Sequence, residues 1–234
     1  MITLPTDAAN REFKDRLYAQ FARVGKAIGN PHRLELVELL AQGERTVEVL
    51  ATEIGMSLAS TSQHLQALCQ GGLVDRRKDG LFVHYRLSDP AVVELSRTVR
   101  TLAERQLADL ERVVRNYFRD RSDADAVSMH ELAVRMRAGN VIVLDARPAH
   151  EYAAGHIAGA ISFPFEEIES RLRELPSNKE YVAYCRGRYC VYADHAVTRL
   201  RARKRKAQRL SEGFPEWKLA GFPVQTGLEH GALA

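Results

Sequence analysis

The chain is organised around the segment Tyr184-Cys185-Arg186-Gly187-Arg188-Tyr189-Cys190. A strand-forming run, 180–184, comes before the cysteine, and a helix-forming run, 191–203, comes after the segment. A loop that leads into a helix N-terminus attracts anions through its backbone N–H groups and the helix dipole. These surroundings, with the two arginines, lower the pKa of a thiol, and the thiolate is the reactive form. The segment therefore predicts a reactive Cys185; the alternative is a free cysteine that packs as a small hydrophobic side chain.

Composition limits the class of protein. The 234 residues are 45% hydrophobic, which suits two domains with packed cores. A net charge of +4 and a pI of about 9.0 permit a nucleic-acid partner. No apolar run approaches the roughly 18 residues that span a membrane, and residues 1–10 lack the pattern of a signal peptide. We therefore expect a cytoplasmic protein with no membrane partner, whose three cysteines are free or redox-active.

Residues 47–72 follow the pattern of a helix-turn-helix. A short helix, 47–54, ends at a glycine, and Ser57 then caps a second helix that ends at Gly71-Gly72. We expect the small or hydrogen-bonding side chains of this second helix to face outward, where they can meet base edges in the DNA major groove. The side chains expected to face outward are Ser60, Thr61, Gln63, His64 and Gln66.

A basic hairpin follows the second helix. Two short strands, 73–78 and 81–87, flank Asp79-Gly80, which is a strong hairpin signal. A basic hairpin beside a recognition helix contacts phosphates and supplies salt-dependent affinity. We expect this role for Arg76, Arg77 and Lys78; the alternative is a solvated charged hairpin.

Two predicted amphipathic helices flank the helix-turn-helix and the hairpin in the sequence. Apolar residues recur at steps of three and four along residues 8–29, and again along a long helix predicted from Asp89-Pro90 to about Phe118. The long helix is too apolar on one side to pack only on a small domain. We therefore expect both helices to contribute to a homodimer interface, which also suits two DNA half-sites.

This half of the chain resembles the winged-helix repressors of the ArsR/SmtB family in residues 30–36, 60–65, 72–74 and 80–85. The resemblance covers roughly residues 8–120 and implies a homodimer that binds a double-stranded DNA operator and is released by an inducer. The residues that match the family's recognition helix, and that the resemblance implies read the DNA, are Ser60, Thr61, Ser62, Gln63 and His64. Many members of the family bind metal through paired cysteines before the recognition helix, or through histidines in the last helix. Residues 46–51 contain no cysteine and residues 88–120 contain no histidine, so we expect no metal site and no cofactor here, and a packed thiol at Cys69.

The second half has the pattern of an α/β domain. We place the domain boundary in the charged stretch 119–125, which gives a first domain of residues 1–122 and a second of residues 123–234. Apolar strands at 141–144, 160–163, 180–184 and 207–210 alternate with helices, which predicts a mainly parallel sheet. Ligands bind beyond the carboxyl ends of such strands. Asp145 and Cys185 both fall there, and Asp145 is expected to hydrogen-bond the loop or Arg147.

Residues 144–147, 155–160, 184–187, 212–217 and 220–224 resemble, in this order, the motifs of a rhodanese domain, and the resemblance covers residues 128–228. It implies that Cys185 accepts a sulfane sulfur from thiosulfate, polysulfide or persulfide and passes it to a thiol. Arg186, Gly187, Arg188, Tyr189 and Cys190 then form the loop that holds the persulfide. A six-residue loop suits sulfur transfer in this fold, whereas phosphatase and arsenate-reductase relatives carry a longer one.

Cys190 departs from the rhodanese pattern, which often has an arginine at this position. Our hypothesis is that, once Cys185 is oxidised or persulfidated, Cys190 resolves it as a disulfide or polysulfide link; the alternative is that Cys190 packs inward. The fold class expected is a mainly α winged helix-turn-helix followed by an α/β rhodanese-like domain. The function expected is a repressor that senses or transfers sulfane sulfur at Cys185. Two alternatives stay open: a sulfurtransferase first of all, and an arsenic-responsive regulator that uses both cysteines.

Overall fold

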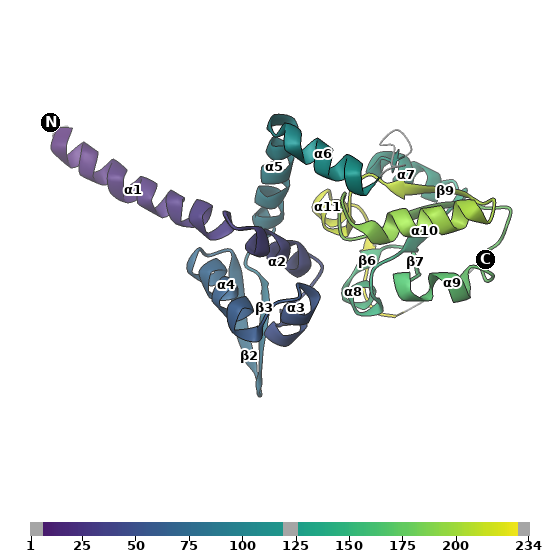
Figure 1. The fold of residues 1–234 in the computed structure, drawn as a ribbon, viewed down its shortest axis with the longest axis horizontal. Coiled ribbons are helices and arrows are strands. Elements are labelled where there is room, and N and C mark those ends of the chain that lie inside the picture. Colours follow the sequence, from purple (N-terminus) through teal and green to yellow (C-terminus); the bar gives the residue numbers. More distant parts are fainter. Residues whose placement is uncertain (1–6, 119–125, 229–234) are drawn as a thin grey trace. The chain divides into compact units, whose positions relative to one another are not determined.

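A computed structural model describes residues 7–118 and 126–228 (Figure 1). The chain divides into two compact units, Met1–Val92 and Val93–Ala234. The predicted linker at 119–125 lies outside the described residues, so a domain boundary at residue 122 stays a prediction. Within the described residues, no helix is both long and apolar enough to cross a membrane.

The first unit is a set of helices with a small antiparallel sheet, which confirms the predicted winged helix-turn-helix. Its core includes Leu36, Leu50, Leu65 and Leu68, all fully buried. The sheet has the order β1-β3-β2. The elements are α1 (Asp7–Ile28), α2 (Pro31–Ala41), β1 (Arg45–Thr46), α3 (Val47–Glu53), α4 (Leu58–Gln70), β2 (Val74–Asp79) and β3 (Phe82–Leu87).

Local capping interactions set where these helices begin. The side chain of Asn30 accepts a hydrogen bond from the Arg33 amide at the start of α2, and Ser57 accepts one from the Ser60 amide at the start of α4. In the hairpin between β2 and β3, Gly80 has a φ of 59°, a left-handed conformation that favours glycine. The predicted second helix and hairpin are thus present with the expected capping and turn residues.

The long helix predicted from Asp89-Pro90 to Phe118 is wrong in one respect, because the structure has two helices here. These are α5 (Ala91–Gln106) and α6 (Ala108–Tyr117). Leu107 separates them with an extended backbone, φ −111° and ψ 98°. The sequence has no glycine or proline at this point, and the apolar spacing continues through the break, so the local pattern does not reveal it.

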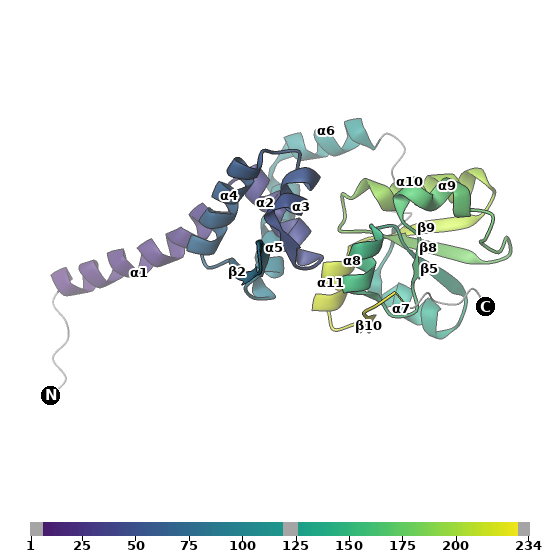
Figure 2. The ribbon, with the colours of Figure 1, turned by 90° about the horizontal axis from the view of Figure 1, so that it is seen from below.

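The second unit contains a five-stranded parallel sheet with helices on both faces, as predicted (Figure 2). The strand order is β4-β9-β8-β5-β7, and a separate antiparallel pair joins β6 to β10. The strands are β4 (Ala126–Val127), β5 (Val141–Asp145), β6 (His156–Ile157), β7 (Ile161–Ser162), β8 (Glu180–Tyr184), β9 (Lys206–Leu210) and β10 (Val224–Gln225). The helices that follow α6 are α7 (Met129–Arg137), α8 (Ala149–Ala154), the short 3-10 helix η2 (Phe165–Glu167), α9 (Ile168–Arg171), α10 (Val191–Ala202) and α11 (Phe214–Leu219).

Both faces of this sheet are buried, which explains why its central strands are continuously apolar. On one face, Leu144 and Ala183 pack in a cluster with side chains of α9 and α10. On the other face, Val143 and Val182 pack in a cluster that includes Trp217 of α11. The carboxyl ends of β5 and β8 lie side by side, because Asp145 pairs with Tyr184 in the register of the two strands.

Candidate functional site

The structure brings Cys185 and Cys190 together at the carboxyl end of β8. Residues 185–190, which we call the Cys185 loop, connect β8 to α10. Cys185 is only 2% exposed, whereas Cys190 is partly exposed and stands at the N-cap of α10. A disulfide joins the two cysteines, whose Cα atoms lie 6.1 Å apart. The loop is tight, since the amide of Cys190 donates to the carbonyl of Gly187 at 3.1 Å.

A second segment, residues 212–216, braces the backbone of this loop. The amide of Phe214 donates to the carbonyl of Cys185 at 3.1 Å. A Cβ on Gly213 would come within 2.3 Å of the Arg186 carbonyl oxygen, so a larger residue here would displace the loop. The predicted motif at 212–217 therefore contributes to the site by packing against it.

The charge of Arg186 is matched by a carboxylate. Its guanidinium lies 2.5 Å from the Oε1 atom of Glu151, a side chain with no exposed surface. Arg188 lies 3.8 Å from an oxygen of Glu104 on α5. Both arginines were expected to add positive charge beside Cys185, and these carboxylates offset much of that charge. The loop is therefore less electropositive than its sequence suggests.

Asp145, at the end of β5, hydrogen-bonds with Tyr184, the last residue of β8. Its carboxylate accepts hydrogen bonds from the side chain of Arg147, at 2.9 Å to Nε, and from the hydroxyl of Tyr184. Arg147 donates in turn to the carbonyl of Gly155 at 2.7 Å. Burial and the nearby Asp145 carboxylate raise the pKa of Tyr184 well above its usual value. The structure thus shows Asp145 bound to Arg147, one of the two partners that we expected, so its role at the site is one of support.

Side chains of α5 and of the segment 212–216 form a network of polar and charged contacts that includes Tyr189 of the loop. The hydroxyl of Tyr189 donates to Oε1 of Glu104 at 2.7 Å. Arg100, one turn before Glu104 on α5, lies 3.0 Å from Glu212 and 3.1 Å from Glu216. Burial raises the pKa of Tyr189, and the hydrogen bond to Glu104 raises it further. Burial likewise raises the pKa of Glu212, although Arg100 opposes this shift.

Sequence reasoning missed four residues of this site: Glu151, Gly213, Arg100 and Glu104. Glu151 lies 35 positions from its partner Arg186, and Arg100 lies 116 positions from its partner Glu216. A charged residue on a predicted helix is expected to be exposed to solvent unless its partner is known. Gly213 belongs to a motif that the sequence analysis recognised, but only the fold shows that a side chain at this position would clash with the backbone of Arg186.

The predicted DNA-reading residues lie on α4 with different exposures. Gln63 is exposed, and Ser60, Ser62 and His64 are partly exposed. The expectation that Thr61 faces outward is wrong, because Thr61 is fully buried and its hydroxyl donates to the Ser57 carbonyl at 3.0 Å. The helical period explains this difference: position 61 shares its face with the buried Leu65 and Leu68.

The side chain of His64 lies near His32 and Arg33. Burial lowers its pKa, and His32 and Arg33 lower it further. The rings of His32 and His64 lie 5.5 Å apart. The lowered pKa favours the neutral imidazole, which can both donate and accept a hydrogen bond.

The basic residues of the hairpin are exposed on β2, but they are not equivalent. Arg77 pairs with Glu44 at 2.5 Å and with Asp79 at 2.9 Å, so its charge is largely balanced. Among the side chains that the structure describes, no carboxylate pairs with Arg76 or Lys78. These two residues are therefore better placed than Arg77 to meet DNA phosphates.

Cys69 on α4 is a free, partly buried thiol. Burial raises its pKa from the ordinary value of 9.0, and this effect outweighs the opposite influence of Arg76. A neutral thiol in such a place is a poor nucleophile. Cys69 thus lacks the features that would mark it as reactive.

Comparisons with known proteins cover both units. Residues 30–76 match the family described as bacterial regulatory protein, arsR family, and residues 128–220 match the rhodanese-like domain. The chain is 45% identical to the HTH-type transcriptional regulator Rv0324 of Mycobacterium tuberculosis, over 94% of this chain and 96% of that protein.

Two solved structures each match part of the chain. One is the homodimeric winged helix-turn-helix DNA-binding domain (fragment 1-100) of Mb0332 from Mycobacterium bovis, with 42% identity, 46% of this chain and 95% of that chain covered, and a TM-score of 0.41. The other is a rhodanese-related protein from Thermoplasma volcanium, with 25% identity, 44% of this chain and 98% of that chain covered, and a TM-score of 0.40.

Proposed function

The chain belongs to the ArsR family of bacterial regulatory proteins, as an HTH-type transcriptional regulator with a rhodanese-like domain, and from this premise we propose that sulfur chemistry at Cys185 controls its binding to DNA. In this proposal the protein is a repressor, and a sulfane-sulfur donor is its inducer. The observation that carries the proposal is the pairing of Cys185 with Cys190 inside one six-residue loop.

The proposed chemistry has two steps, each of which conserves atoms and charge. In the first, the Cys185 thiolate attacks the outer sulfur of a persulfide R–S–S–H. The sulfur–sulfur bond of the donor breaks, R–S⁻ leaves, and Cys185 carries –S–S–H. In the second, the Cys190 thiolate attacks the Sγ atom of Cys185, the new bond breaks, HS⁻ leaves, and the two cysteines form a disulfide.

Several features of the loop support this sequence of steps. Cys190 is the more exposed of the two cysteines, and the disulfide shows that its sulfur can reach the sulfur of Cys185. Packing by Phe214 and Gly213 holds the Cys185 end of the loop backbone at the end of β8. A resolving cysteine in the same loop favours an intramolecular switch over release of sulfur to an external thiol.

The DNA-binding part of the proposal rests on the exposed side chains of α4 and β2. Gln63, with Ser60, Ser62 and His64 beside it, reads base edges, while Arg76 and Lys78 contact phosphates. Thr61 positions the helix through its hydrogen bond to Ser57 and makes no base contact. The ligand of this surface is a double-stranded operator.

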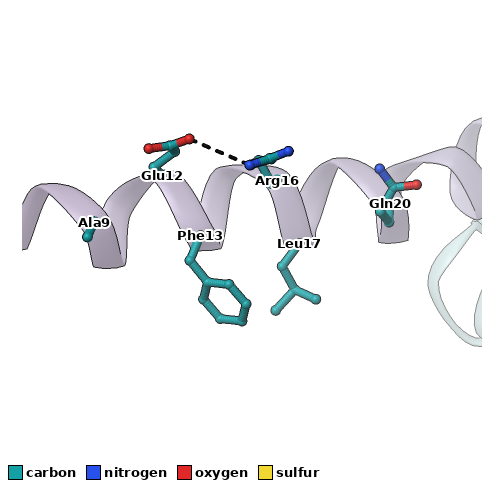
Figure 3. Close-up of a pocket in the computed structure, with 6 residues that line it drawn as sticks. All are labelled: Ala9, Glu12, Phe13, Arg16, Leu17 and Gln20. Carbon is teal, nitrogen blue, oxygen red and sulfur yellow. Dashed lines mark ion pairs between the residues drawn. The ribbon is translucent and has the colours of Figure 1, made fainter. Parts of the chain in front are cut away.

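Pairing of two chains accounts for the exposed apolar surface of α1. Phe13 and Leu17 point to the same side of this helix, away from the ion pair between Glu12 and Arg16 (Figure 3). Phe13 is 63% exposed, and Phe21 continues the same surface two turns later at 59%. A second copy of this chain that packs on the surface would bury these rings, which favours a homodimer.

Two measurements on the full chain test the proposal. Operator binding is followed by gel shift, with a DNA site selected from a random library by the reduced protein, in the presence of glutathione persulfide, polysulfide, thiosulfate, arsenite or arsenate. Mass spectrometry then shows which cysteines are modified or linked. The proposal requires that a sulfane-sulfur donor releases the DNA from the wild type and that Cys185→Ser prevents this release.

The other outcomes separate the alternative functions. Release by arsenite or arsenate alone would support an arsenic-responsive regulator. Rapid transfer of sulfur from thiosulfate to cyanide, lost in Cys185→Ser and without any effect on DNA binding, would support a sulfurtransferase. A wild type that never links Cys185 to Cys190 after sulfur treatment would exclude the resolving role of Cys190.

A further inference from the structure

Two side chains of α5, one helical turn apart, contact the Cys185 loop or the segment 212–216 that packs against it. Glu104 contacts the loop itself, since its Oε1 atom accepts from the Tyr189 hydroxyl at 2.7 Å and lies 3.8 Å from Nε of Arg188. Arg100 contacts the segment 212–216 that packs against the loop, at 3.0 Å from Glu212 and 3.1 Å from Glu216. All of these residues belong to the second unit.

Glu216 links Arg100 to the loop backbone. One of its oxygens pairs with Arg100, and the other accepts a hydrogen bond of 3.1 Å from the amide of Gly213. Gly213 is the residue whose backbone lies against Arg186, in a space that leaves no room for a Cβ. The carboxylate of Glu216 is almost fully buried, which makes its two contacts stronger than those of a surface pair. Through this residue, α5 contacts the loop at a second point.

The helix that makes both contacts is also the direct continuation of the winged-helix unit. The first unit ends at Val92, while α5 begins at Ala91 and continues to Gln106 (Figure 1). The backbone therefore passes from the DNA-binding unit into the contacts with the loop without any intervening turn. Rigid secondary-structure elements are among the structures that carry energetic coupling between distant sites.

We infer that Arg100 and Glu104 are positioning residues that couple the state of the Cys185 loop to DNA binding through α5. This inference rests on the proposed function and adds the element that carries its signal. Tyr189 directly precedes Cys190, so a change at the disulfide displaces the residue that donates to Glu104. The hydrogen bond to Glu104 then differs between the linked and the reduced loop, and such a differential contact is what allosteric coupling needs.

The test compares operator affinity in two states of the full chain. The dissociation constant is measured for protein reduced with dithiothreitol and for protein treated with glutathione persulfide, and the ratio of the two defines the coupling. The variants are Arg100→Gln and Glu104→Gln, with Glu94→Gln as the matched control, because Glu94 is an exposed carboxylate on the same helix. Trp217 fluorescence confirms that each variant is folded, and mass spectrometry confirms that Cys185 and Cys190 still react.

We expect a ratio of about tenfold for the wild type and for Glu94→Gln, and a ratio several-fold smaller for Arg100→Gln and Glu104→Gln, with unchanged cysteine chemistry. Variants that react normally and keep the full wild-type ratio would overturn the inference and leave the proposed function standing. A wild type whose affinity does not change on treatment would overturn both.

Discussion

The guanidinium of Arg186 lies 2.5 Å from the carboxylate of Glu151, which has no exposed surface. This pair fixes the residue that follows Cys185 to the start of the second unit's helix α8. The arginine that the sequence presents as a source of positive charge is therefore also an anchor of the loop. This buried carboxylate therefore contributes both to the stability of the loop and to its electrostatic character.

Replacing Glu151 should destabilise the second unit. Glu151→Gln removes the carboxylate charge that pairs with the largely buried Arg186, and breaking a buried ion pair in this way costs about 3 kcal/mol of unfolding free energy. Urea unfolding followed by Trp217 fluorescence measures this loss, since Trp217 is the only tryptophan of the chain and is buried in this unit. The control Glu131→Gln removes a half-exposed pair with Arg135 and should cost less than about 1 kcal/mol. Equal losses in the two variants would contradict the account of the pair.

Cys69 should react slowly with alkylating agents in the folded protein. Burial holds the pKa of its thiol above 9.0, so at pH 7.5 iodoacetamide should modify Cys69 several-fold more slowly than in 6 M guanidinium chloride. The neutral thiol contributes stability that is fully present below pH 9 and is lost as the pH rises through the raised pKa. Mass spectrometry of the reduced, time-quenched protein measures the rate. Equally fast modification of folded and unfolded protein would show that Cys69 is an exposed thiol.

The hairpin lysine should contribute more to DNA binding than the neighbouring arginine. Lys78→Ala should weaken operator binding and lower the slope of log affinity against log salt by about 1, because one phosphate contact is lost. Arg77→Ala should lower the slope less, since Glu44 and Asp79 already balance its charge. Fluorescence anisotropy at several salt concentrations measures both slopes. A larger effect of Arg77→Ala would contradict the pairing seen here.

The apolar surface of α1 should be needed for dimer formation. Phe13→Glu removes about 2 kcal/mol of apolar burial from each chain and places two charges in the interface, so the variant should be monomeric. Size-exclusion chromatography with light scattering measures the mass. Leu81→Glu is the control, because Leu81 is 95% exposed at the tip of the hairpin, away from α1 in the chain, and should leave the dimer intact. A dimeric Phe13→Glu would place the interface elsewhere.

Much of the fold follows from short-range patterns. The Ser57 cap and the Asp79-Gly80 turn lie where the sequence predicts them, because such signals depend on neighbours within four residues. The buried strand before Asp145 is likewise visible as a continuous apolar run. The break at Leu107 has no such signal. The inward position of Thr61 does have one, its helical spacing from Leu65 and Leu68, but the polar side chain favoured the opposite interpretation.

The candidate site was only partly predictable for a related reason. Cys185 and Cys190 stand in one short segment, so their proximity follows from the sequence. The carboxylates that surround the loop come from three other parts of the chain, at Glu104, Glu151 and Glu216. Their contribution depends on distances between elements, which no local pattern encodes.

The central claim is that sulfur chemistry at Cys185 changes DNA binding, and the operator dissociation constant of the full chain tests it most directly. Fluorescence anisotropy compares protein reduced with dithiothreitol and protein treated with glutathione persulfide, for the wild type and Cys185→Ser. The account predicts that treatment weakens binding of the wild type about tenfold and leaves Cys185→Ser unchanged. An unchanged wild type, or an equal loss of affinity in Cys185→Ser, would contradict it.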